Sequence, residues 1–162
     1  MKTLLLTCVG LMFAVTVFAA SPPSPDSARE SKSLNDVCAH CHTLQIVTDT
    51  PRSFEEWHDT VQAMVDRGAG GTDEQFDDLM DYLHRTMTTI NVNAADAGEL
   101  EIVLSVPKTV AEAIVARRST QKFTDLADLK SVSGIDAAVV DAKARLIFFK
   151  GTPPIGPGKP YE

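Results

Sequence analysis

The chain has 162 residues, of which only three are cysteines, and its formal net charge at pH 7 is −7. This length suffices for one ordinary domain or two small ones, and so few cysteines exclude a fold held together by a disulfide framework. The charge is uneven, because residues 21–87 have thirteen acids against five bases whereas residues 88–150 have eight of each. The change in charge along the chain predicts two modules.

Residues 1–20, MKTLLLTCVGLMFAVTVFAA, have the pattern of a secretory signal peptide: a lysine near the start, an apolar run, and two alanines for cleavage. The apolar run is too short for a comfortable membrane span. A lipoprotein attached through Cys8 is disfavoured, because the preceding LLT lacks the small residue wanted before the cysteine. We therefore expect an exported, periplasmic protein whose mature chain keeps only Cys38 and Cys41 and has no transmembrane segment.

Two segments lack any regular hydrophobic period. Residues 21–31, SPPSPDSARES, are rich in Pro and Ser, which predicts a flexible tether. Residues 151–162, GTPPIGPGKPYE, predict a Pro/Gly-rich tail that is extended where its prolines fall. Between these segments several helical patterns occur and no convincing strand-like alternation does, so the sequence predicts an all-α fold.

Three helices are expected in the first half of the chain. The first covers residues 31–42, SKSLNDVCAHCH. The second covers residues 53–68, where Ser53 and Glu56 form a capping box and apolar residues recur with a helical period. The third covers residues 72–87, opens with another capping box and has an acidic outer face. Three helices of this length make a poor core by themselves, and a large apolar group would complete it.

The sequence CAHCH at residues 38–42 places two cysteines three apart, with a histidine directly after the second. Three chemistries use such a cluster: a thioredoxin-like dithiol, a zinc site and covalent haem attachment. A thioredoxin-like dithiol normally follows a strand, but no strand is expected before Cys38. A tetrahedral zinc site needs four ligands, and the sequence has no second ligand pair to complete one. In covalent attachment, Cys38 and Cys41 add to the two haem vinyl groups and His42 is the proximal iron ligand. We therefore favour one haem c over zinc or a redox dithiol, with His40 as a spacer.

The segments CAHCHTL, SFEEWHDTVQAMVDRGA and TDEQFDDLMDYL together resemble the compact bacterial cytochrome c domains of the quinohaemoprotein type. The resemblance covers about residues 33–86, and it implies a mono-haem, class I-like helical fold for the domain that we place at residues 32–87. It also favours Met64 as the second axial ligand of the iron, because Met64 lies where these cytochromes have a methionine. Met80, an open iron position and His58 are the alternatives.

Three other residues are candidates for supporting roles around the haem. Trp57 is expected to pack as a wall of the core or to line the haem edge. Arg52 is a candidate partner for a haem propionate, because a guanidinium pairs well with a carboxylate. The carbonyl group of Pro51 is a candidate to orient His42 through its second ring nitrogen.

Residues 90–149 resemble the tandem helix-hairpin-helix domain of ComEA-type competence proteins, through the segments INVNAAD, KTVAEAIVARR, KFTDLADL and VSGID. In that family two glycine-containing turns present backbone N–H groups to DNA phosphates. Here the first turn, residues 105–107, reads Ser-Val-Pro and has neither glycine, while the second has Asp136 near the phosphate path. The resemblance therefore implies the fold, with a docking or structural role as in the photosystem extrinsic subunit that shares it.

The helix-hairpin-helix module, which we place at residues 88–150, has no net positive charge, so the attraction that dominates non-specific DNA affinity is largely absent. Arg117 and Arg118 are expected to form a solvated helix end. We expect an exported c-type cytochrome that passes single electrons, is not a substrate-converting enzyme, and has a redox partner with a basic surface. The alternatives are a DNA-binding or DNA-uptake protein with a structural or sensory haem, and an open-site haem sensor of a diatomic gas.

Overall fold

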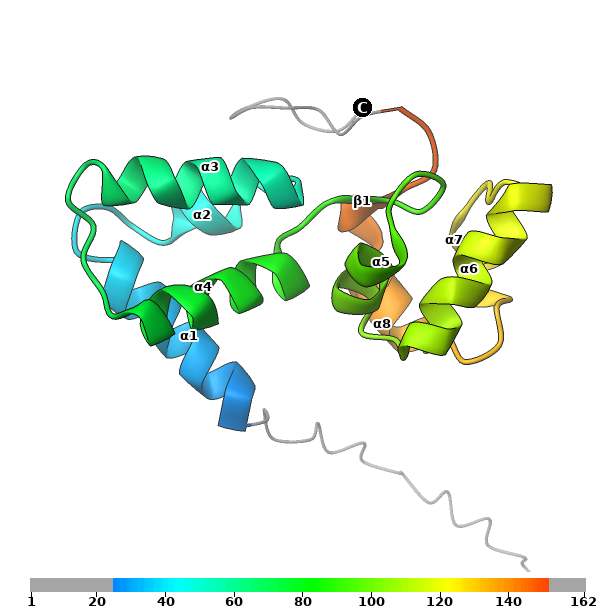
Figure 1. Ribbon diagram of the computed structural model, residues 1–162, viewed down its shortest axis with the longest axis horizontal. Coiled ribbons are helices and arrows are strands. Elements are labelled where there is room, and N and C mark those ends of the chain that lie inside the picture. Colours follow the sequence, from blue (N-terminus) through cyan, green and yellow to red (C-terminus); the bar gives the residue numbers. More distant parts are fainter. Residues whose placement is uncertain (1–24, 152–162) are drawn as a thin grey trace, which may run out of the picture.

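The structure is a computed structural model that describes residues 25–151. The predicted signal peptide, the first residues of the predicted tether and nearly all of the predicted tail lie outside this part. Within it, the chain forms eight α-helices, one short 3-10 helix and two strands of two residues each (Figure 1). The prediction of a helical fold is confirmed apart from this small sheet. None of the described helices has the length and apolar character needed to cross a lipid bilayer.

The first half of the described chain forms a small helical unit, shown in blue to green in Figure 1. Its helices are α1 (Pro25–Cys38), α2 (Gln45–Thr48), α3 (Phe54–Val65) and α4 (Asp73–Thr86). The main packing is between α1 and α4, with α3 against α4. Its core consists of Leu34, Val37, Trp57, Leu79, Leu83 and Met87.

The second half forms a separate core. Its elements are β1 (Ile90–Asn91), α5 (Ala97–Leu104), α6 (Lys108–Thr120), α7 (Leu126–Lys130), α8 (Ala137–Ala142), the 3-10 helix η1 (Ala144–Leu146) and β2 (Ile147–Phe148). Here α5 packs against α6, and α7 packs against α8, which gives two successive helical hairpins. The parallel pairing of Ile90 with Ile147 brings the end of this half back to its beginning.

The bounds of α1 differ from the sequence prediction at both ends. The helix begins at Pro25, so residues 25–31 are helical where the sequence predicts a tether. It ends at Cys38, so Cys41 and His42 lie in the following turns and not on the same helix. The two cysteines therefore lie on either side of a helix C-terminus.

Two ion pairs with buried carboxylates explain the early start of α1. Glu30 is 4% exposed and pairs with Arg85 of α4. Asp78 of α4 is also 4% exposed; it accepts from Arg29 at 2.9 Å and from the Ser33 hydroxyl at 3.3 Å. Asp78 therefore does not belong to the exposed acidic face of α4. A buried carboxylate needs such partners, and α1 can supply them only if it extends back to these residues.

The two halves are joined by backbone pairing and not only by a covalent link. Arg52, just before α3, forms a parallel bridge with Thr88. Its N–H donates to the Met87 carbonyl at 3.3 Å, and its own carbonyl accepts from the Thr89 N–H at 2.9 Å. Phe54, the first residue of α3, packs against the core of the second half.

Candidate functional site

The CAHCH segment lies where α1 ends and the chain turns toward α2. Cys38 is half-buried and Cys41 is exposed, and both thiols are free. Burial raises the pKa of the Cys38 thiol, because it disfavours the charged thiolate. Cys38 is therefore an ordinary protonated thiol near neutral pH, and not the acidic thiol that marks a reactive redox dithiol.

A pocket of about 340 Å³ opens between α1, the α2 segment, α3 and α4. Its volume falls within the range of about 300–1,000 Å³ that is typical of cofactor and ligand pockets. Its walls are mostly apolar and include Val37, Val61 and Leu79. All six residues that the sequence predicts as cofactor ligands or contacts line this one pocket: Cys38, Cys41, His42, Arg52, Trp57 and Met64.

The ring of His42 is held by the chain beside it. Its Nδ1 lies 3.1 Å from the carbonyl oxygen of Thr43. Because a carbonyl oxygen can only accept, this contact is a hydrogen bond when Nδ1 carries the hydrogen, and in that tautomer the lone pair is on Nε2. Nε2 is therefore the nitrogen available to a metal. The sequence predicts this orienting role for the carbonyl of Pro51, whereas in the structure the carbonyl of Thr43 has it.

Three side chains are candidates for the second axial position, and the structure places only one of them at the pocket. Met64 lines the pocket from α3. Met80 packs against the core that surrounds it, but does not line it. His58 is exposed on the other side of α3, where its ring lies 5.8 Å from that of His84.

Arg52 is a half-buried cation at the edge of the pocket. Its guanidinium carbon lies 5.5 Å from the ring centroid of Trp57. The Nε atom is buried, and within the described part of the chain it has no hydrogen-bond partner. A buried N–H donor without an acceptor is costly, so an anionic oxygen in the pocket would satisfy it.

Trp57 forms the inner wall of the pocket. Its side chain is 2% exposed, and its indole N–H donates to the Met87 carbonyl at 3.3 Å. The one polar group of the ring is therefore satisfied away from the pocket, and its apolar surface can face a ligand.

Sequence reasoning missed part of the lining. Ile46 and Val47 come from the four-residue helix α2, which has no recognisable sequence period. Arg67 adds a second cation beyond the end of α3, and its guanidinium donates to the Ala63 carbonyl at 2.7 Å. Phe76 closes the pocket from α4, and its place on the apolar stripe of the predicted third helix is a signal that points to it.

The residues between 25 and 151 contain no group of three or more His, Cys, Asp and Glu side chains that could hold a metal ion. A tetrahedral zinc ion normally takes four such ligands.

The two hairpin turns of the second half offer few free N–H groups. In the first turn, Ser105 is left-handed with φ 54°, the Val106 N–H donates to the Glu101 carbonyl at 3.2 Å, and Pro107 has no N–H. In the second turn, the Asp136 carboxylate caps α8 and accepts from the Ala138 N–H at 2.8 Å. Both observations agree with the loss of phosphate-binding groups that the sequence predicts.

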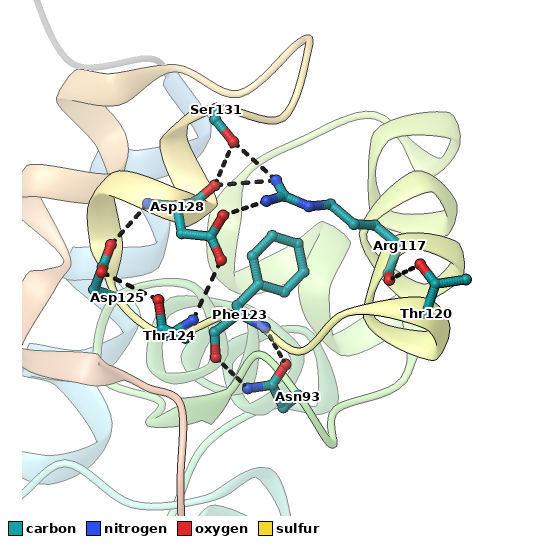
Figure 2. A network of polar contacts seen from close by, with 8 residues as sticks. All are labelled: Asn93, Arg117, Thr120, Phe123, Thr124, Asp125, Asp128 and Ser131. Carbon is teal, nitrogen blue, oxygen red and sulfur yellow. Dashed lines mark hydrogen bonds and ion pairs between the residues drawn. The ribbon is translucent and has the colours of Figure 1, made fainter.

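The expectation that Arg117 and Arg118 form a solvated helix end is wrong. Figure 2 shows Arg117 reaching from α6 to α7, where it pairs with the Asp128 carboxylate and donates to the Ser131 hydroxyl at 2.8 Å. Its guanidinium carbon lies 4.6 Å from the ring centroid of Phe123. Arg118 donates to the Val92 carbonyl at 2.7 Å. The two guanidinium groups therefore tie the end of α6 to other parts of its own module.

Other cations of the second half have internal partners too. Lys130 pairs with Asp141, and Lys143 donates to the Val103 carbonyl. Burial, followed by the nearby positive charge of Arg85, lowers the pKa of Lys143. Several cations of this module thus make contacts that hold its own helices together.

Comparison with known proteins identifies the second half and leaves the first half without a match. A family model described as the helix-hairpin-helix motif matches residues 86–147. This segment, which holds both helical hairpins, is therefore a helix-hairpin-helix module. Searches of curated proteins and of solved structures find no significant match to the chain.

Proposed function

We propose that this protein is an exported c-type cytochrome that carries one covalently bound haem and transfers single electrons between periplasmic partners. The observation that supports the proposal most is the gathering of Cys38, Cys41, His42 and Met64 around one apolar pocket. These residues come from separate elements, and a pocket that packs only as a core would not need two thiols, an imidazole and a thioether. The haem domain would comprise residues 32–87.

Each residue of the pocket fits one part of the group. The thiols of Cys38 and Cys41 would form thioether bonds to the vinyl carbons, and Nε2 of His42 would bind the iron on one side. The sulfur of Met64 is the candidate for the other side. Arg52 would pair with a propionate, and this pairing would give its buried Nε an acceptor.

When bound, haem supplies an iron centre that accepts and returns one electron. The chain's own residues control the surroundings of this centre. Trp57 and Leu79 exclude water from the inner wall, and a low-polarity surrounding is one of the factors that set the potential of a haem. The excess of acids over bases in residues 21–87 favours a partner with a basic surface, because complementary charge steers transient encounters.

In this proposal the helix-hairpin-helix module is a docking element for another protein. A second candidate function, DNA binding, is favoured by the match of residues 86–147 to the helix-hairpin-helix motif, because the hairpins of the ComEA-type proteins that this segment resembles present N–H groups to DNA phosphates. Against it stand the internal pairing of Arg117 and Arg118 and the cap of Asp136 on its own helix. We therefore place DNA binding second.

Haem staining of the denatured chain tests the cytochrome proposal. Protein produced with an export signal and haem maturation machinery should keep its haem on a denaturing gel, because thioether bonds survive unfolding. Combined Cys38→Ala and Cys41→Ala should remove the stain, whereas the control His40→Ala should keep it. A wild-type chain that is exported, soluble and unstained would contradict the proposal.

A further inference from the structure

The contact between α3 and α4 contains a pair of histidines that the proposed haem site does not use. His58 lies on α3 and His84 on α4, and their ring centroids are 5.8 Å apart, with the ring planes tilted by 49°. The ring of Phe54, one turn before His58, lies closer still, with its centroid 4.5 Å from that of His84. The His84 ring therefore packs against this face of α3.

His84 is packed in a way that suits a neutral ring. The residue is half-buried, and its Nε2 atom is buried without a hydrogen-bond partner among residues 25–151. In a neutral imidazole one of the two nitrogens carries no hydrogen, whereas in the protonated ring both nitrogens are donors. A buried charged donor without an acceptor costs far more than a buried neutral nitrogen. The observed packing is therefore favoured only while His84 is unprotonated.

The groups closest to His84 act in the same direction. Burial, followed by the charge of His58, lowers the pKa of His84 from its usual 6.5. The opposite effects of Asp81 and of the Phe54 backbone are smaller. Asp81 is exposed, so water screens its attraction for a proton on the ring.

Carboxylates on the other elements packed against α4 have partners of their own. On α1, Glu30 pairs with Arg85, which directly follows His84 in the chain. On α5, the Glu99 carboxylate accepts from the Asp96 N–H at 3.0 Å. A proton on His84 would thus add a positive charge beside Arg85 while these two carboxylates are already engaged.

Phe54 connects this histidine to the second half of the chain. It is the first residue of α3, and its ring packs against the core of the helix-hairpin-helix module. It also lines a cavity of about 290 Å³ together with Ile90 and Phe148. Figure 1 shows the start of α3 pointing toward β1 across this junction. The packing of His84 against Phe54 therefore bears on how the two modules are joined.

We propose that protonation of His84 loosens the junction between the two modules. The charged ring would turn toward water, and Phe54 would lose the neighbour that supports its packing on the second core. The backbone pairs beside it, in which Arg52 bonds to the Met87 carbonyl and to the Thr89 N–H, would then open more often. This device uses none of the proposed iron ligands, so it stands apart from the proposed function.

Amide hydrogen exchange on the full-length protein tests the proposal. The protection factor, which is the ratio of the intrinsic to the measured exchange rate, removes the pH dependence of the exchange chemistry itself. The Arg52 and Thr89 amides should lose protection between pH 7.5 and 5.5. The loss should reach at most about tenfold, because a single proton with a pKa of 6.5 in the open state cannot shift the equilibrium further in this range. Low concentrations of urea should hardly change it, because a local opening exposes little surface.

Histidine variants assign the effect. His84→Phe keeps a ring beside Phe54 but cannot be protonated, so the loss of protection should disappear; His84→Gln is a second variant that cannot be protonated and should behave alike. His58→Gln removes the neighbouring charge and should make the loss smaller. The control His40→Gln changes an exposed histidine outside this contact and should leave the loss unchanged.

Three results would overturn the proposal. Constant protection of Arg52 and Thr89 across this pH range would show that acid does not open the junction. An equal loss in wild type and in both His84 variants would assign the opening to other groups. A loss at pH 5.5 with the strong urea dependence of complete unfolding would show that the whole chain opens and not the junction.

Discussion

Arg117→Met separates the two roles that an arginine of the helix-hairpin-helix module can have. In the structure this side chain pairs with the Asp128 carboxylate, donates to the Asp128 carbonyl at 3.2 Å and to the Ser131 hydroxyl at 2.8 Å, and lies over the Phe123 ring (Figure 2). Methionine keeps the apolar stem and removes the charge with its hydrogen bonds. A structural role predicts lower stability, whereas a DNA-binding role predicts lower DNA affinity.

The size of the stability loss follows from these contacts. A hydrogen bond to a charged group contributes about 1.5–3 kcal/mol, and an exposed cation–π contact about 0.5–1 kcal/mol. The side chains of Arg117 and Asp128 are 30% and 20% exposed, so solvent screening lowers the first contribution to about 1–2 kcal/mol. The free energy of unfolding should therefore fall by about 2 kcal/mol.

Urea unfolding followed by circular dichroism measures this loss. With a denaturant dependence of about 1–3 kcal/mol per molar for a small protein, the midpoint should fall by roughly 1 M. Lys150→Met is the matched control, because it removes one charge from an exposed residue and should shift the midpoint little. Asp128→Asn should weaken the same contact, so its effect should not add fully to that of Arg117→Met.

Titration of a fluorescent DNA duplex completes the assay. The structural role predicts that wild type, Arg117→Met and Lys150→Met show equally low affinity at physiological salt. An unchanged urea midpoint together with weaker duplex binding and a salt dependence reduced by about one phosphate contact would refute the reasoning. It would also promote DNA binding to the leading function.

Two more predictions concern the first half of the chain. Met64→Ala should abolish the weak long-wavelength charge-transfer band of a Met-ligated ferric haem and lower the potential, whereas Met80→Ala should keep the band; the reverse result in oxidised spectra would make Met80 the ligand. Burial, followed by the charge of His58, lowers the pKa of His84 from its usual 6.5, against a smaller opposite effect of Asp81. Below about pH 6.5 the unfolded chain therefore binds a proton that the folded chain does not. The free energy of unfolding should consequently decrease as the pH is lowered through this range. His84→Asn should reduce this fall, as measured by urea unfolding at pH 7.5 and 5.5; an equal fall in both proteins would contradict the assignment.

The features that could be predicted from sequence are those set by neighbours along the chain. The capping box of Ser53 with Glu56, and that of Thr72 with Gln75, are present with both of their hydrogen bonds. Such a box involves residues three apart, so its geometry is decided locally. The apolar period of the third predicted helix is likewise confirmed at Leu79 and Leu83, which are both 1% exposed.

The features that could not be predicted depend on residues far apart in sequence. Glu30 extends α1 back into the predicted tether because Arg85, on another helix, pairs with it. The ion pair of Arg117 with Asp128 depends on the packing of α6 against α7. From sequence alone, two adjacent arginines near a helix end therefore predict a solvated end. Counting the charged residues in the sequence gives the correct net charge of the module, which is zero. The count does not tell which of these residues pair with one another.

The candidate pocket shows the same division. The candidate ligands Cys38, Cys41 and His42 follow from their spacing alone, and Met64 is a candidate because of its place on an apolar stripe combined with a family resemblance. The buried Nε of Arg52, which has no hydrogen-bond partner among the described residues, is visible only in three dimensions. The chemistry of a guanidinium suggests an anionic partner for Arg52 from sequence, while the structure adds a buried donor that has no acceptor among the described residues.

The link between the modules bears on how a docking module could act on a haem domain. The predicted boundary between residues 87 and 88 falls inside a bonded segment: Trp57 donates to the Met87 carbonyl, and Arg52 bonds to Met87 and Thr89. Residue 90 then begins the strand that pairs with β2. Trp57 and Arg52, which both line the pocket, are thus hydrogen-bonded to residues 87–89, where the helix-hairpin-helix module begins. Under the proposed function, a partner that bound the helix-hairpin-helix module and shifted it would therefore act on Arg52 and Trp57 through these hydrogen bonds.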